Sequence, residues 1–228
     1  MTTSTSVPAV DGAANETGRP LDRRARRRQE TIEEIVGIAI EVMTESGVNG
    51  LSLAEVARRL GVQPPSLYKY FPSIAALYDE LFRRGHERHL DAMRQAMREA
   101  GPGIPALTAA LEASGRWALA NRALAQLMFW RPVPRFIPSP EALAPSVEMH
   151  ALQRSALAGA VAEGQVGPDA DSDDACYVLS ILISGVVNQH LANEPELPWE
   201  QGRFTRQFPR LIQLFGAGYP PRPTARGD

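Results

Sequence analysis

Lysine and cysteine are almost absent from this chain of 228 residues, which contains one of each, Lys69 and Cys176. A single cysteine cannot form an intrachain disulfide, so a disulfide-rich secreted scaffold is excluded. The first residues lack the positive charge and the apolar run of a signal peptide. The longest apolar stretch, from Tyr177, is short for a membrane span and contains Asn188 and Gln189. We therefore expect a cytoplasmic protein with no membrane partner.

The net charge of −2 does not by itself indicate a nucleic-acid partner. The distribution of charge is more informative, because the stretch "RRARRR" at 23–28 contains five arginines in six positions. Such a run fits either a solvated helix start or a basic segment that binds DNA phosphates. The five residues are Arg23, Arg24, Arg26, Arg27 and Arg28.

Hydrophobic periodicity predicts helices along most of the chain and no strand, so the expected fold class is all-α. An apolar stripe over 32–43 predicts a first helix, and the capping-box spacing of Ser52 and Glu55 predicts a second, which Gly61 ends. Further helices are expected over 104–119, 121–130, 141–163, 172–193 and 201–216, with a proline-rich loop at 131–140.

Two prolines, Pro64 and Pro65, are expected to begin a third helix, because the first turn of a helix does not need their missing N–H groups. Pro72 ends this helix, and Ser73 caps a fourth one that reaches about Arg98. The fourth helix is long enough to connect two subdomains.

Two short helices joined by a tight glycine-containing turn are typical of a helix-turn-helix, whose second helix enters the DNA major groove. On the third helix Leu67 and Phe71 can point inward, whereas Tyr68 and Lys69 remain available for phosphates. A helical hairpin whose tyrosines cover the edge of a core has the same pattern. The outward-facing candidates are Gln63, Ser66, Tyr68, Lys69 and Tyr70.

The stretch "LSLAEVARRLGVQPPSLYKYFPSIAALYDELF" resembles the DNA-binding domain of TetR-family transcriptional repressors. The resemblance is specific over 26–84 and architectural afterwards. It implies three DNA-binding helices, a linking fourth helix, and an all-α C-terminal domain that binds a small molecule and dimerises through its last two helices. The expected organisation is a disordered tail (1–20), a DNA-binding domain (21–72), a ligand-binding and dimerisation domain (73–217) and a C-terminal tail (218–228).

The resemblance also implies individual DNA contacts. Ser52 resembles a phosphate-contacting residue, and Pro65 and Tyr68 would contact thymine methyls or sugars. One departure is Ile74, which stands where the family usually has a phosphate-contacting lysine. Besides the arginine run, the predicted contacts are Ser52, Gln63, Pro64, Pro65, Ser66, Tyr68, Lys69 and Tyr70, with Arg58 and Arg59 as further candidates.

The C-terminal half concentrates aromatic and methionine side chains in and after the stretch 116–130. Such side chains usually form core, but they also line small-molecule cavities in helical bundles. The predicted lining is Trp117, Phe129, Trp130, Met149 and His150.

Two late segments predict a dimer interface. Residues 177–187 are apolar nearly all round, which indicates a covered outer face, and 204–215 adds a second stripe. The predicted interface residues are Leu182, Val186, Phe204, Phe208, Leu211, Ile212 and Phe215. We expect no metal site, because His86 and His89 have no third ligand nearby and are expected to be solvent-exposed.

These features predict a homodimeric repressor that binds a palindromic operator in double-stranded DNA and is released by a small apolar effector. No catalytic motif or cofactor site is expected. The alternative is a helical small-molecule-binding or scaffolding protein with a degenerate DNA-binding half, which only Ile74 and the mild acidity favour.

Overall fold

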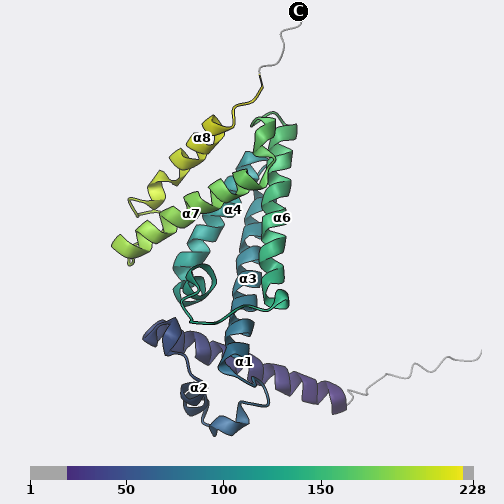
Figure 1. The fold of residues 1–228 in the computed structure, drawn as a ribbon, viewed down its shortest axis with the longest axis vertical. Coiled ribbons are helices and arrows are strands. Elements are labelled where there is room, and N and C mark those ends of the chain that lie inside the picture. Colours follow the sequence, from purple (N-terminus) through teal and green to yellow (C-terminus); the bar gives the residue numbers. More distant parts are fainter. Residues whose placement is uncertain (1–19, 223–228) are drawn as a thin grey trace, which may run out of the picture.

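The computed structural model describes residues 20–222, which form helices and turns but no strand (Figure 1). The all-α prediction is confirmed. Most of the two expected tails, 1–19 and 223–228, lies outside the described residues. The α-helices are α1 (Pro20–Ser46), α2 (Leu53–Leu60), α3 (Ile74–Glu99), α4 (Ile104–Ala120), α5 (Arg122–Ala125), α6 (Pro140–Ala162), α7 (Asp173–Asn193) and α8 (Phe208–Gly218).

The N-terminal core is enclosed by α1, α2 and the first half of α3, and α5 closes it from the other side (Figure 1). The hydroxyl of Ser52 caps α2 by accepting a hydrogen bond from the backbone N–H of Glu55 at 3.2 Å. Gly61 ends α2 with φ 73°, a left-handed conformation that favours glycine. The predicted bounds of α2 are therefore confirmed.

The prediction of a third helix is wrong, because the segment is a 3-10 turn (Pro64–Ser66) followed by further turns over 67–70. A residue that precedes proline is disfavoured in the α conformation, and Gln63 is accordingly extended with ψ 142°. The same restriction applies to Phe71, which precedes Pro72 and lies outside the turns. The helical turns are therefore confined to 64–70. The backbone N–H of Phe71 still donates to the carbonyl of Leu67 at 2.9 Å, an α-helical spacing.

Helix α3 extends from the N-terminal core into a second core, where it packs against α4 and α6 (Figure 1). Helix α7 packs against α4, and α8 packs against α7. Leu107, Leu157, Leu179 and Phe208 are among the fully buried side chains of this second core. The prediction of a long connecting helix is thus confirmed, and α3 is the element that the two cores share.

Two C-terminal elements differ in detail from the predictions. A 3-10 turn (Thr205–Gln207) precedes α8, and Pro209 stands in the first turn of α8, where its missing N–H breaks no helical bond. The predicted helix over 121–130 is α5 followed by a π-helical turn (Gln126–Trp130). Of the two possibilities that Pro209 leaves open in the sequence, a late start or a kink of the last helix, the structure has the late start, at Phe208.

Helix α7 corrects the expectation about the apolar stretch. By length and composition alone, the 21 residues of α7 are enough to cross a membrane. Its side chains Leu179, Ile183 and Val187 are buried in the second core. Here α7 serves as a core helix with one uncovered apolar side.

Candidate nucleic-acid interface and ligand cavity

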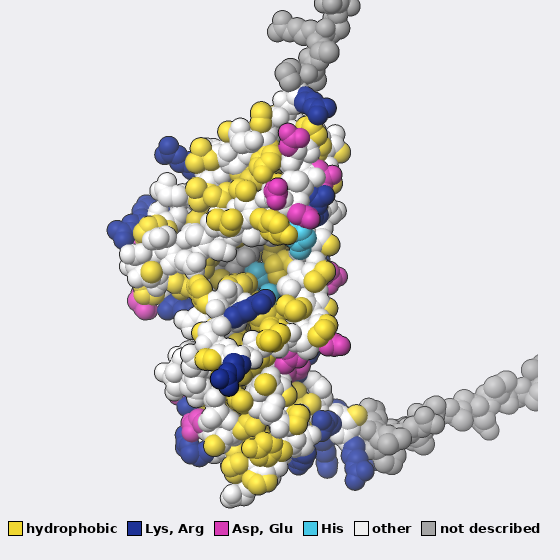
Figure 2. Space-filling view, in the orientation of Figure 1, with side chains coloured by type: hydrophobic (Ala, Val, Ile, Leu, Met, Phe, Trp, Pro, Cys, Tyr) yellow, Lys and Arg dark blue, Asp and Glu magenta, His cyan; other side chains and the backbone are white. Residues whose placement is uncertain are grey.

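The segment between α2 and α3 forms one end of the molecule and presents an aromatic surface. Tyr68 is 54% exposed, whereas its neighbours Leu67 and Phe71 are buried, as the sequence predicted. Gln63 and Pro65 are exposed as well. In Figure 2, hydrophobic side chains gather at this end, with Lys and Arg side chains beside them on the adjoining part of α1.

The arginine run lies on the first turns of α1, where all five of its side chains are exposed. Arg28 connects this run to the segment between α2 and α3. Its Nη1 donates to the backbone carbonyl of Lys69 at 3.1 Å, and its guanidinium lies 5.2 Å from the centroid of the Tyr70 ring. The Lys69 ammonium lies over the same ring at 4.9 Å. The structure thus brings the two predicted groups of DNA contacts onto one surface.

The arginines of α2 are occupied by carboxylates. Arg58 makes two hydrogen bonds to Glu55, at 2.8 and 2.7 Å, and Arg59 bonds to both Glu55 (2.7 Å) and Glu45 (2.6 Å). Hydrogen bonds from Arg58 and then Arg59 lower the pKa of Glu55 to about 2. The positive charge of this end therefore comes mainly from α1. The hydroxyl of Ser52, a predicted phosphate contact, is engaged as the α2 cap but remains exposed.

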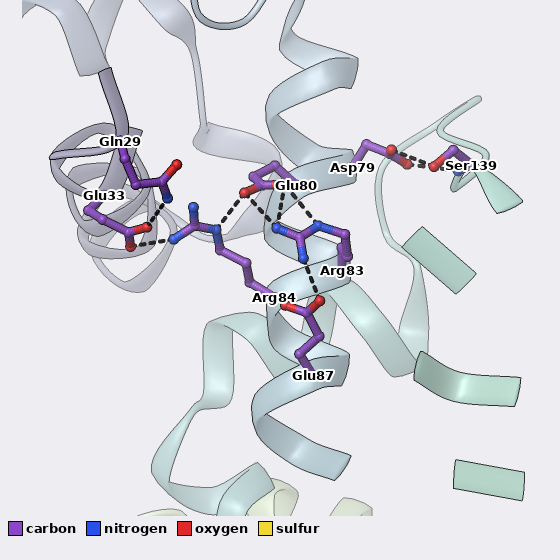
Figure 3. A network of polar contacts seen from close by, with 8 residues as sticks. All are labelled: Gln29, Glu33, Asp79, Glu80, Arg83, Arg84, Glu87 and Ser139. Atoms are coloured by element: carbon purple, nitrogen blue, oxygen red, sulfur yellow. Dashed lines mark hydrogen bonds and ion pairs between the residues drawn. The ribbon is translucent and has the colours of Figure 1, made fainter. Parts of the chain in front are cut away.

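An ion-pair network joins α1 to α3 (Figure 3). The side chain of Arg84 is 11% exposed and bonds to Glu33 on α1 and, at 2.6 Å, to Glu80 on α3. Arg83 extends the network to Glu87. The hydrogen bond from Arg84 lowers the pKa of Glu33. Burial acts to raise the pKa of Glu80, but the hydrogen bonds from the two arginines outweigh it, and the pKa is lowered.

The same part of α3 is tied to the start of α6. The carboxylate of Asp79 accepts hydrogen bonds from the backbone N–H and the hydroxyl of Ser139, each at 2.7 Å (Figure 3). Ser139 in turn caps α6 by accepting from the N–H of Ala142 at 3.1 Å. The orientation of α3 is therefore specified by polar contacts to α1 on one side and to α6 on the other.

A cavity of about 310 Å³ lies between α3, α4, α6, α7 and the π-helical turn. Figure 2 shows a hollow in the surface near the middle of the molecule, beside histidine side chains. Its apolar lining comprises Ala118, Phe129, Trp130, Met149, Ile183 and Val187. Its polar lining comprises His89, Ser114, Gln153, Ser180, Ser184 and Asn188.

Three of the five predicted lining residues, Phe129, Trp130 and Met149, lie on this cavity. Trp117 and His150 do not. The ring of Trp117 packs against His89, with the ring centroids 4.9 Å apart. His150 lies at the surface, where its Nε2 is 3.1 Å from a carboxylate oxygen of Asp173 at the start of α7.

The polar lining was missed because its members are dispersed over four helices. The available signal was a polar residue within an otherwise apolar helix face, such as Ser114 on α4 and Gln153 on α6.

The expectation that His86 and His89 are solvent-exposed is wrong, because they are 6% and 2% exposed. Burial lowers the pKa of His86 to about 4 and that of His89 to about 3. The two rings pack edge-on against Phe129, at centroid distances of 6.3 and 5.4 Å. The buried stripe of α3 continues from Phe82 at spacings of three and four residues through both histidines, and this periodicity was the available signal.

The predicted dimer residues fall into two groups. Phe208, Ile212 and Phe215 are buried within the chain between α7, α8 and the second core, so they are not available to a partner. Val186 is buried as well but borders the surface groove between α7 and α8. Leu182, Phe204 and Leu211 are half-buried and line a surface groove between α7 and α8. The large apolar side chains of α7 and α8 with the highest exposed fractions are Ile181 (69%) and Leu214 (59%). The sequence prediction missed both.

Residues 35–81 match the sequence profile of the family described as "Bacterial regulatory proteins, tetR family". The chain is 38% identical over 69 residues to the uncharacterized HTH-type transcriptional regulator YobS of Bacillus subtilis, a match that covers 30% of this chain and 36% of YobS. It is 34% identical over 99 residues to the HTH-type transcriptional activator FasR of Mycolicibacterium smegmatis, covering 43% of each chain. The matches span less than half the length of these curated relatives.

Similarity to a solved structure extends further along the chain. A protein of unknown function from Rhodococcus sp. RHA1 superposes with a TM-score of 0.70 and 25% identity, over 82% of this chain and 94% of that one. Through residues 35–81 the chain is similar to the TetR family of bacterial regulatory proteins. The curated relatives YobS and FasR are regulators of transcription and not enzymes, in agreement with the prediction.

Proposed function

We propose that the chain is a repressor that binds a palindromic operator as a homodimer and is released by a small, apolar effector. The observation that carries this proposal is the position of α3. Its first residues follow the candidate DNA-binding segment, and its middle contributes His89 to the cavity. An effector that moves α3 would change the separation of two DNA-binding segments, which in a dimer must match about one DNA turn of 34–36 Å.

The DNA-binding part is tested with a duplex that carries the DNA upstream of the chain's own gene. Replacement of Tyr68 by alanine is expected to weaken binding to this duplex, since the exposed ring loses its contacts to bases or sugars, by about tenfold or more. The exposed Ile137 in the loop before α6 offers a control, Ile137→Ala, with unchanged affinity. Fluorescence anisotropy measures both. Equal affinities for the two variants would support the helical scaffolding alternative. A separate measurement of transcription from the same duplex, with and without the protein, distinguishes a repressor from an activator.

The proposed dimer interface is the exposed side of α7 and α8. Ile181 and Leu214 present large apolar side chains there, and exposed apolar surface beside an apolar groove is typical of a protein interface. Ile181→Asp and Leu214→Asp are expected to shift the protein from dimer to monomer in light scattering, with the helical content unchanged. Val147→Asp, on the exposed face of α6, is the matched control. A dimer that persists in both variants would place the interface elsewhere.

A further inference from the structure

The cavity is lined without formal charge. Among the residues of 20–222 that line it, none is aspartate, glutamate, lysine or arginine, and the single histidine, His89, is buried. Burial lowers the pKa of His89 to about 3, so its ring is uncharged near neutral pH. A charged group in the cavity would lose its hydration without meeting an opposite charge, which is costly. The lining therefore selects against ions of either sign.

The inner end of the cavity is polar. Gln153 on α6 is 7% exposed and Ser114 on α4 is 9% exposed, and both line the cavity. The side-chain amide of Gln153 lines the cavity and is not one of the fully buried unpaired groups of the described residues, so it can bond to a molecule there. The Ser114 oxygen lies 2.8 Å from Nε2 of His89. Because a hydroxyl both donates and accepts, Ser114 retains the capacity for a second hydrogen bond.

The outer end of the cavity is aromatic and open. Phe129 and Trp130, from the π-helical turn, are 43% and 40% exposed. Trp130 and Asn188 also border a neighbouring surface groove, so the cavity opens toward this groove. An apolar body can lie between these rings while a polar group on the same molecule reaches the buried amide of Gln153.

We propose that the cavity binds an uncharged, compact molecule with an apolar body and one carboxamide-like group that hydrogen-bonds with Gln153 and Ser114. A carboxamide offers both an acceptor and donors, which is what the amide of Gln153 requires to be satisfied on both of its atoms. The inference rests on the proposed function, in which this cavity holds the effector, and it specifies the chemistry of that effector.

The test uses probes that share one apolar body and differ in the polar group. They are 4-phenylbutanamide, the anion 4-phenylbutanoate, the cation 4-phenylbutylamine and the hydrocarbon butylbenzene. Calorimetric titration of the full chain near neutral pH, without DNA, is expected to show binding of the amide, with both charged probes at least about tenfold weaker. Equal affinity for the carboxylate, or no measurable heat with the amide, would overturn the proposal.

The role of Gln153 is tested by Gln153→Leu, which removes the amide and keeps a similar volume. The affinity for 4-phenylbutanamide is expected to fall about tenfold or more, while the affinity for butylbenzene stays equal or increases. Gln95→Leu is the matched control, because Gln95 is exposed on α3 and does not line the cavity. Amide binding that is unchanged in Gln153→Leu contradicts the proposal. Since these titrations contain no DNA, they remain interpretable if operator binding, measured separately, is absent.

Discussion

Two adjacent stretches of α3 differ in how they treat charge. At Glu80, Arg83 and Arg84 the helix uses full charges in a network that reaches α1 (Figure 3). At His86 and His89 it buries groups that could carry charge but are kept neutral. The charged stretch fixes the orientation of the DNA-binding part. The neutral stretch keeps the neighbouring cavity free of charge, so one helix carries both the charged contacts to α1 and an uncharged wall of the cavity.

The largest expected effect comes from protonating the neutral stretch. Below about pH 6.5 the unfolded chain protonates both histidines, whereas the folded chain does so only near pH 4 for His86 and pH 3 for His89. The unfolded state therefore binds more protons, and folding stability falls as the pH drops below about 6.5. At about pH 5 the loss is about 2 kcal/mol for each histidine. Urea denaturation at about pH 5 and at about pH 7.5 measures this loss of stability.

The variant His86→Phe keeps a ring at the same place and is expected to remove about half of this pH dependence. His150→Gln, which removes a histidine that lies at the surface and outside the cavity, serves as the control. A pH dependence that stays the same in His86→Phe would mean that the buried histidine does not resist protonation.

The next effect comes from breaking the charged stretch. Arg84→Met leaves the half-buried Glu80 and the exposed Glu33 without their shared cation, and we expect the free energy of unfolding to fall by about 2 kcal/mol after allowance for solvent screening. Arg94→Met is the matched control on the same helix. The pair of Arg94 with Glu148 is more exposed, so its loss is expected to change stability by less than about 0.5 kcal/mol. Equal losses in the two variants would mean that the network adds nothing beyond single surface pairs.

The N-terminal part was largely predictable because its signals are local. The Ser52 cap, the Gly61 terminator and the apolar stripe of α2 lie within ten residues and specify one short helix. The prolines of the next segment carry a local signal too: the residue before a proline is disfavoured in the α conformation. The prediction considered only the missing N–H groups of the prolines. The third helix was predicted wrongly for that reason.

The cavity was only partly predictable because its lining is brought together by packing. Ser114 and Gln153 meet His89 only when α4 and α6 pack on α3, and no spacing in the sequence encodes those contacts. The prediction that Phe129 and Trp130 line a cavity rested on their closeness in sequence. It agrees with the structure because the π-helical turn presents both rings to the same space. His150 was assigned wrongly because neighbours in sequence on a helix, such as Met149 and His150, point in different directions.

The smallest expected effect distinguishes the two arginine clusters of the DNA-binding part, and it is visible only in salt dependence. The α1 arginines are exposed, whereas Arg58 on α2 is held by Glu55. Each phosphate that is neutralised contributes about 0.9 to the slope of log affinity against log salt concentration. Replacing Arg26, Arg27 and Arg28 by alanine is expected to flatten this slope by up to about 3, equally for all DNA sequences. Arg58→Ala is expected to leave it unchanged, because the charge removed was already paired. Anisotropy titrations over a series of salt concentrations measure both, and an unchanged slope in the triple variant would show that the arginine run is solvated and does not contact DNA.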